Sequence, residues 1–177
     1  HEEAHAIVTL GEKNIYMTGN SVRAEVYAAY TFSERALRVD PLWWFTSTEP
    51  LFVGRLDLSA DLAVQFGAPA FKWRAFFPND EDLLGNFKFD PMGQSVFDMN
   101  TWNRIAEGLL RLKGNLILAG TVSFPDERHY ELLQRRGVAS SMQHFTILGL
   151  NTWRWPTGVP YSFALSPEVQ TYAWRAC

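Results

Sequence analysis

The first five residues, His1-Glu-Glu-Ala-His5, match the pattern H-E-x-x-H. In zinc proteases this pattern places two histidines one helical turn apart, where they bind the metal while the glutamate acts as general base. The pattern requires a helix, but here it begins at residue 1 and continues into Ala6–Leu10, which has the composition of a strand. His1 and His5 are therefore candidate metal ligands, and a frayed, solvated chain end is the alternative interpretation.

A copper site is a second hypothesis for the same terminus. If His1 is the first residue of the mature protein, its amine and imidazole could chelate copper together with a second histidine. His129 and His144 are the available partners. The simpler interpretations are a solvated His129 and a hydrogen-bonded His144, so we predict no cofactor.

A run of carboxylates, Asp80, Glu81 and Asp82, could bind Ca²⁺ with the help of further ligands. No EF-hand spacing is present, so a solvated loop is the simpler interpretation. The sequence also contains no G-x-S-x-G, P-loop or G-x-G-x-x-G motif. Its single cysteine, Cys177, excludes an intrachain disulfide and a cysteine metal cluster. We therefore predict no catalytic residues and a protein that is not an enzyme.

Aromatic side chains are unusually frequent, with 13 Phe, 7 Trp and 6 Tyr. Trp153 and Trp155 are two residues apart and would share one side of a strand, where they could stack on sugar rings. The alternative is that most of these rings lie in the core or in a subunit interface. We expect Trp43, Trp44 and Phe45 to form such a core or interface cluster.

Length and charge narrow the class of protein. A chain of 177 residues has the size of one domain, and its net charge of −3 argues against nucleic-acid binding by the chain as a whole. No apolar run approaches the roughly 20 residues of a membrane helix, and we expect no signal peptide. We therefore expect a soluble protein with no membrane partner. The start at His1 instead of Met suggests a processed or trimmed chain.

Alternating apolar and polar residues predict the elements that would position these side chains. Gly54–Val64 and Phe71–Phe77 alternate as half-buried strands do, and Val22–Tyr30 has the same pattern. Short strands are expected at Ala6–Leu10 and Asn14–Thr18, on either side of Gly11. Helical spacing predicts two short helices, near residues 100–113 and 126–136, which Gly114 and Gly137 would end. The expected fold is mainly β, an antiparallel β-sandwich or jelly roll of eight to ten strands with these two helical insertions.

The predicted domain organisation follows from this strand count. A β-sandwich would occupy residues 1–125. Residues 126–177 would add a helix and strands that complete the sandwich as a single domain or form an arm.

Four segments between Leu51 and Asn103 form a recognisable series, namely Phe52–Leu62, Ala70–Pro78, Leu83–Pro91 and Gln94–Met99. This series resembles jelly-roll capsid proteins of picornavirus-like and comovirus-like RNA viruses. The resemblance implies a virion protein whose partners are copies of itself or homologous shell subunits. Genomic RNA would lie on one face, near Arg111, Arg135 and Arg136. Scattered surface charge is the alternative interpretation of these arginines.

The resulting prediction is a non-enzymatic, self-assembling structural protein, a viral capsid subunit or fragment that forms homo-oligomers. The first alternative is a carbohydrate-binding β-sandwich module that uses Trp153 and Trp155. The second alternative is a metal-dependent enzyme that uses His1 and His5.

Overall fold

The computed structural model describes residues 2–11, 14–52, 54–56, 63–78, 99–118, 128–141, 146–147, 150–151, 158 and 164. The chain divides into two compact units. Unit 1 comprises residues 1–74 and 104–115, and unit 2 comprises residues 75–103 and 116–177. Each unit is described by itself.

The sheet of unit 1 contains three antiparallel strands in the order β2-β1-β3. They are β1 (His5–Leu10), β2 (Asn14–Gly19) and β3 (Ala63–Phe66). In the register, Ile7 of β1 is paired with Met17 of β2 and with Val64 of β3. The central strand alternates in burial, and Ile7 is fully buried. The strands expected at Ala6–Leu10 and just after Gly11 are therefore confirmed.

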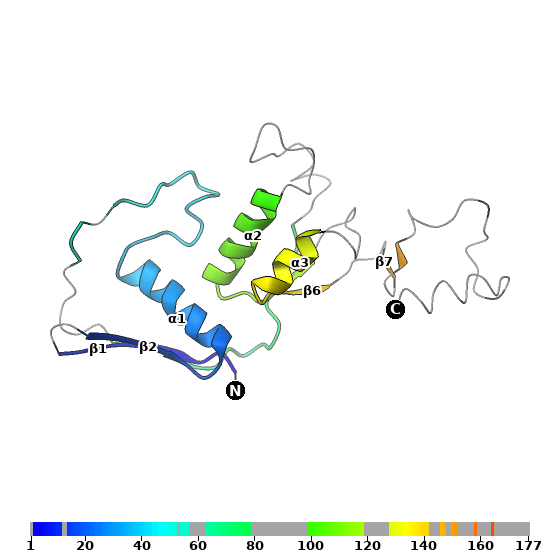
Figure 1. Cartoon of the computed structure of the whole chain (residues 1–177). Helices are drawn as coiled ribbons and strands as arrows, with labels where there is room; N and C mark the ends of the chain where they lie inside the picture. The colour runs from blue at the N-terminus through cyan, green and yellow to red at the C-terminus, as the bar shows by residue number, and fades with distance from the viewer. Residues whose placement is uncertain are drawn as a thin grey trace. The chain divides into compact units, whose positions relative to one another are not determined.

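Helix α1 (Val22–Arg35) covers one face of β1 and β2 (Figure 1). Its buried residues are Ala24, Tyr27, Ala28 and Thr31, whose spacing is that of one helical face. The Ser21 hydroxyl caps the helix by accepting the Ala24 N–H at 3.2 Å. The strand predicted over Val22–Tyr30 is therefore wrong. Apolar residues at the even positions mimic the alternation of a strand. A capped segment whose buried residues have this spacing is more stable as a helix.

Gly19 joins β2 to α1 where the backbone turns sharply. A Cβ at this position would lie 2.5 Å from the backbone carbon of Ala24. Because that contact is with backbone, any larger residue would displace the first turn of α1. The close approach fixes how the helix leaves the sheet.

Helix α2 (Met99–Arg111) ends at a tight turn that is closed by Gly114. The Gly114 N–H donates to the Leu109 carbonyl at 2.8 Å, and a Cβ on Gly114 would lie 2.1 Å from the Leu109 side chain. The turn is tied to α1, because the Tyr27 hydroxyl donates to the Gly114 carbonyl at 2.8 Å. The helix expected near residues 100–113 is confirmed, with the predicted glycine at its end.

Unit 2 contains a parallel sheet in the order β4-β5-β6. Its strands are β4 (Ala75–Phe76), β5 (Leu116–Leu118) and β6 (Ala139–Ser141). Helix α2 lies between β4 and β5 in the sequence, and α3 (Arg128–Arg135) lies between β5 and β6. Ile117 at the centre of β5 is fully buried, as expected for a parallel sheet covered by helices. A separate antiparallel pair is formed by β7 (Thr146–Ile147) and β8 (Leu150–Asn151).

The predicted jelly roll is wrong. The described residues form two three-stranded sheets, one two-stranded sheet and three helices, which is a mixed α/β arrangement. Neither long strand has the predicted extent. Of Gly54–Val64, residues 54–56 are not in a strand, Ala63 and Val64 belong to β3, and residues 57–62 lie outside the described residues. Of Phe71–Phe77, only Ala75 and Phe76 are in a strand. The alternation there does not mark a buried face, since Phe71 is 74% exposed.

The helix predicted near residues 126–136 is confirmed as α3. It ends before Gly137, whose φ of 70° lies in the left-handed region that favours glycine. The division at residue 125 stays a prediction. None of the helices in the described part of the chain is long and apolar enough to span a membrane.

Because Ile7 is fully buried, we expect its side chain to contribute strongly to the free energy of unfolding. We expect Ile7→Ala to lower the free energy of unfolding by about 3 kcal/mol, because it leaves a cavity at a fully buried site. Leu10→Ala in the same strand is the control. It should cost less than about 1 kcal/mol, because Leu10 is 55% exposed. Urea unfolding of both variants measures the difference, and equal losses would contradict the assigned core.

Candidate functional site

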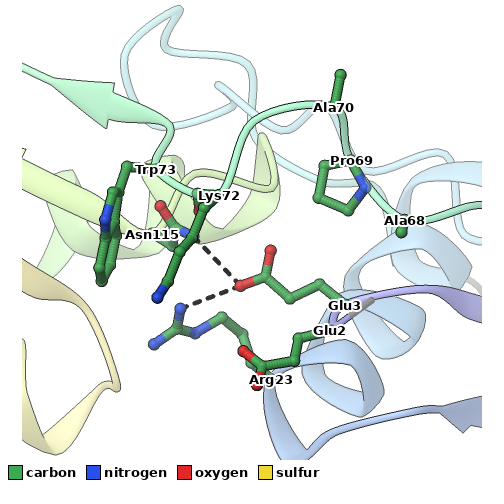
Figure 2. Close-up of a pocket in the computed structure, with 9 residues that line it drawn as sticks. All are labelled: Glu2, Glu3, Arg23, Ala68, Pro69, Ala70, Lys72, Trp73 and Asn115. Atoms are coloured by element: carbon green, nitrogen blue, oxygen red, sulfur yellow. Dashed lines mark hydrogen bonds and ion pairs between the residues drawn. The ribbon is translucent and has the colours of Figure 1, made fainter.

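A pocket of about 670 Å³ opens in unit 1, beside the start of β1 (Figure 2). Its lining combines charged, amide and aromatic side chains, namely Glu2, Glu3, Arg23, Ala68, Pro69, Ala70, Lys72, Trp73 and Asn115. We call it the Glu3 pocket. Residues from four separate stretches of the chain meet here, so the pocket exists only in the folded unit.

Glu3 is held in an uncommon backbone conformation. Its φ is 87°, in the left-handed region that non-glycine residues rarely adopt. Its N–H donates to the Asn20 side-chain oxygen at 2.7 Å, and only 8% of the residue is exposed. Such backbone strain persists where surrounding contacts determine it, and it is concentrated at functional sites.

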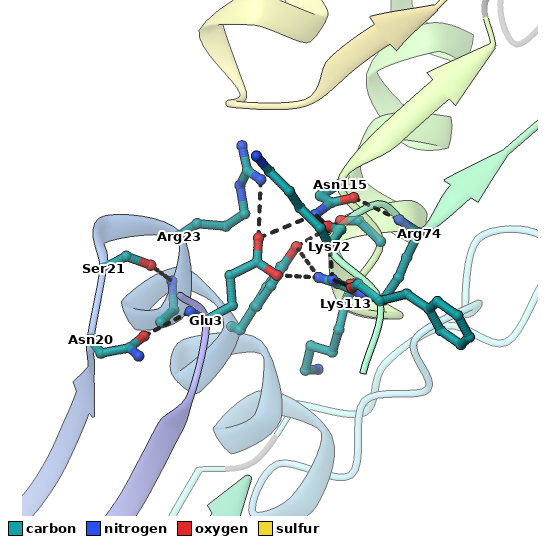
Figure 3. Close-up of polar contacts among 12 residues, drawn as sticks. Glu3, Asn20, Ser21, Arg23, Lys72, Arg74, Lys113 and Asn115 are labelled. Atoms are coloured by element: carbon teal, nitrogen blue, oxygen red, sulfur yellow. Dashed lines mark hydrogen bonds and ion pairs between the residues drawn. The ribbon is translucent and has the colours of Figure 1, made fainter. Parts of the chain in front are cut away.

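The Glu3 carboxylate is the centre of a polar network (Figure 3). It accepts hydrogen bonds from Arg23 at 3.0 Å, from the Asn115 amide at 3.2 Å and from the Arg74 guanidinium. Burial raises the pKa of this carboxyl group. The bonds from Arg74, Asn115 and Arg23 outweigh that effect, and the net pKa lies below its ordinary value. Glu3 is therefore ionised at neutral pH.

Asn115 and Arg74 also hold the backbone of the loop that leads into β4. The Asn115 side chain accepts the Arg74 N–H at 2.9 Å and donates to the Lys72 carbonyl at 2.7 Å. The Arg74 side chain donates to the carbonyl of Lys113 at 2.7 Å and to that of Phe71 at 2.8 Å. The loop is thus fixed from both sides although it has no regular secondary structure.

This fixed loop presents aromatic rings to solvent. Trp73 lies between two residues whose backbones are tied to Asn115, yet its side chain is 51% exposed. The Lys72 ammonium lies 5.3 Å from the centre of the Trp73 ring, a cation–π distance. An exposed large aromatic on an ordered backbone is a feature of binding sites.

Two cations converge at the same place. Figures 2 and 3 both show the charged ends of Arg23 and Lys72 next to each other. The side chain of Arg23 is 32% exposed, and Lys72 is exposed. Neighbouring like charges repel, so this arrangement favours an anionic group in the pocket.

The side chains of the Glu3 pocket are suited to binding a ligand and not to acid catalysis by Glu3. A general acid needs a raised pKa, whereas the pKa of Glu3 is lowered and its oxygens are occupied by three donors. A fixed aromatic surface with cations beside it suits a ligand that has an apolar face and a negative charge.

The comparison with known families decides the class of protein. The family model for glycosyl hydrolase family 115 matches residues 66–177, more than half of the chain. The chain belongs to glycosyl hydrolase family 115. No match was found among curated proteins.

A solved structure supports the fold of this family 115 chain. The structure is that of a family 115 4-O-methyl-α-glucuronidase with specificity for decorated arabinogalactans. The sequences are 20% identical, the TM-score is 0.78, and the match covers 98% of this chain and 24% of the other. The chain therefore spans about a quarter of the length of that glucuronidase.

Membership of family 115 overturns the capsid interpretation. A protein cannot be assigned to a viral shell on weak strand motifs when most of its sequence matches a glycosyl hydrolase family. The predictions of a non-enzymatic structural protein, self-assembly into a homo-oligomer and location in a virion are wrong. The shell-subunit and genomic-RNA partners are wrong for the same reason. The motifs misled because alternating residues and a terminal proline occur in many folds.

The structure places His5 beside the Glu3 pocket but not in its lining. His5 is buried in β1, where its Nε2 lies 3.0 Å from the Thr31 hydroxyl and its ring stacks on Phe66 at 4.9 Å. His1 lies outside the described residues, so both metal hypotheses stay predictions. Among the residues that the structure describes, no three His, Cys, Asp or Glu side chains form a group that could hold a metal.

Of the other histidine and carboxylate candidates, only His129 is among the described residues. His129 is buried in unit 2, where its ring stacks on Trp102 at 4.8 Å. His144 and the run from Asp80 to Asp82 lie outside the described residues.

The structure describes one of the two predicted aromatic groups, the cluster of Trp43, Trp44 and Phe45. Trp43 and Trp44 are half-buried and Phe45 is 47% exposed. The Arg104 guanidinium lies 5.0 Å from the centre of the Trp43 ring, so this cluster packs on α2. Its role as an interface stays a prediction. Trp153 and Trp155 lie outside the described residues.

Sequence reasoning missed the residues that form the pocket. The sequence singles out Glu3 only as part of H-E-x-x-H, and it predicts Trp73 in a half-buried strand. Asn115 offers no local signal, because its partners Glu3 and Lys72 are 112 and 43 residues away in the sequence. A non-glycine residue with positive φ is equally invisible without coordinates.

The Glu3 network predicts a pH-dependent contribution to stability. The folded-state pKa of Glu3 is lowered, so its contribution is fully present above the ordinary value of 4.5 and is lost as pH falls through the folded-state pKa. We expect Glu3→Gln to cost about 2–3 kcal/mol at pH 7, because it leaves Arg23 and Arg74 without their carboxylate. The cost should shrink below pH 4.5.

Urea unfolding at pH 7 and at pH 3.5 measures this change. The control is Glu25→Gln, an exposed carboxylate in the first turn of α1, which should cost less than about 1 kcal/mol. An undiminished Glu3→Gln cost at the lower pH would contradict the role of the ionised carboxylate.

His5 predicts a second pH dependence. Burial lowers the pKa of its imidazole, and the positive Lys113 lowers it further, while a hydrogen bond to the Glu3 carbonyl partly opposes them. Below the ordinary value of 6.5 the unfolded chain binds a proton that the folded chain does not. Stability should therefore fall as pH drops from 7.5 to 5.5. His5→Gln should flatten this slope in unfolding curves, and an unchanged slope would assign it to other groups.

Proposed function

We propose that this chain serves a glycosyl hydrolase of family 115 that releases uronic acid branches from polysaccharides. The observation that carries the proposal is the family match over residues 66–177. The solved relative, which is described as a 4-O-methyl-α-glucuronidase, supports the choice of a uronic acid as the released sugar. Because the chain spans a quarter of that relative's length, the activity is proposed for the whole protein.

The arrangement of unit 2 is consistent with an enzyme scaffold. Strands β4, β5 and β6 are parallel neighbours in sequence order, and a helix lies between each pair in the chain. Repeated strand–helix–strand units of this kind form α/β enzymes, which bind ligands at the carboxyl ends of their strands. The parallel sheet supports a catalytic fold more directly than the predicted sandwich did.

The Glu3 pocket contributes binding to this function. Hydrolysis of a glycosidic bond ordinarily requires two carboxyl groups, of which one has a raised pKa and donates a proton to the leaving oxygen. Glu3 has a lowered pKa and accepts three hydrogen bonds. We therefore assign the hydrolytic carboxylates to other residues and assign the pocket to holding the glycan.

The test uses the protein expressed from its complete gene. We expect it to release free uronic acid from a polysaccharide that carries 4-O-methylglucuronic acid branches, as measured by anion-exchange chromatography. The control substrate is the same polysaccharide after chemical reduction of its carboxyl groups, from which little or no sugar should be released. Equal release from both substrates would refute the uronic acid preference, and release from neither would refute the activity.

A further inference from the structure

We infer that the Glu3 pocket is a binding subsite for a uronic acid unit, distinct from the place where the bond is cleaved. The Trp73 ring would stack on the sugar ring, and Lys72 and Arg23 would bind its carboxylate. The inference rests on the proposed function, because it supplies the substrate class. Three independent features of the pocket support it.

The first feature is the balance of charge. The lining itself is electrically balanced, because the cations Arg23 and Lys72 stand against the carboxylates Glu2 and Glu3. Arg74, which is not in the lining, adds one cation that is paired with Glu3, so the lining together with this ion pair carries one positive charge. Glu3 lies between two of these cations and neutralises one charge. The ends of Arg23 and Lys72 lie side by side in both close-ups. A carboxylate placed between them would relieve their repulsion and accept charge-assisted hydrogen bonds.

The second feature is the fixed aromatic surface. Lys72 and Arg74, the two neighbours of Trp73 in the sequence, are hydrogen-bonded through their backbones to the buried Asn115. Trp73 therefore loses little backbone entropy when a ligand binds, and pre-organisation of this kind improves affinity. A large ring that is 51% exposed leaves apolar area available for a sugar's C–H face.

The third feature is the shape of the cavity. Its volume of about 670 Å³ falls in the range of about 300–1,000 Å³ that is typical of small-molecule sites. The strained Glu3 backbone and the buried Asn115 form a rigid base for the ligand-facing side chains. Rigid support of this kind is what a specific site requires.

The experiment measures binding by isothermal titration calorimetry on the protein expressed from its complete gene. The probes are glucuronic acid, glucose and acetate, which separate the ring from the charge. We expect glucuronic acid to occupy one more site in the wild-type protein than in Trp73→Ala. At that site, glucose and acetate should each bind at least tenfold more weakly than glucuronic acid.

Two further variants test the separate contributions. Lys72→Gln should weaken glucuronic acid binding at this site about tenfold and leave glucose binding there unchanged, because only the charge is removed. Trp73→Phe should restore binding in part, because it keeps an aromatic face. Phe52→Ala and Arg135→Gln are matched controls. Phe52 is 95% exposed and the Arg135 side chain is 75% exposed. Neither residue lines the pocket.

The outcomes separate this inference from the proposed function. If uronic acid is released but Trp73→Ala keeps the wild-type number of glucuronic acid sites, the subsite is refuted and the activity stands. If no sugar is released but the site is lost in Trp73→Ala, the proposed activity is refuted and the subsite stands. Equal losses in Trp73→Ala and Phe52→Ala would also refute the subsite, because the effect would not be specific to the pocket.

Discussion

The ionised carboxylate of Glu3 is the interaction on which the organisation of unit 1 depends. It joins the turn before β1 to Arg23 of α1, to Arg74 before β4 and to Asn115 after α2. These four stretches are far apart in the sequence. A buried carboxylate is stable only when it is paired and hydrogen-bonded, so the requirement to satisfy one charge sets the relative positions of the sheet, the helices and the loop.

The same network explains why an irregular loop can act as a rigid part of a site. Arg74 and Asn115 satisfy the backbone polar groups of residues 71–74 without a strand partner. The loop is thereby freed from the alternation of a sheet, and its aromatic rings point to solvent instead of the core. The network holds two residues with positive φ, Glu3 and Lys113, which is a cost that evolution retains chiefly where geometry matters for function.

Corrections to the predicted fold have a common physical origin. Periodicity reports which side chains share a face, but Ala24 and Ala28 are four residues apart and fit either period. The burial of Tyr27 on the same face fits a helix alone, and the Ser21 cap with burial against β1 decides for a helix. At Phe71 and Trp73 the alternating pattern was real, yet the burial it predicted did not occur. The resemblance to capsid proteins rested on short alternating segments, which occur in many folds. The match to family 115 covers residues 66–177, a much longer stretch.

The sequence alone determined the local elements whose signals are local. These are the first two strands on either side of Gly11, helix α2 with Gly114 after it, and helix α3 before Gly137. Capping residues and glycines act within a few residues of themselves, so their effects can be read from the chain. The tertiary structure decided the parallel sheet, the helical state of Val22–Arg35 and the Glu3 pocket. Each of these depends on contacts between residues tens of positions apart, and such contacts are selected by burial and charge pairing, which no local pattern encodes.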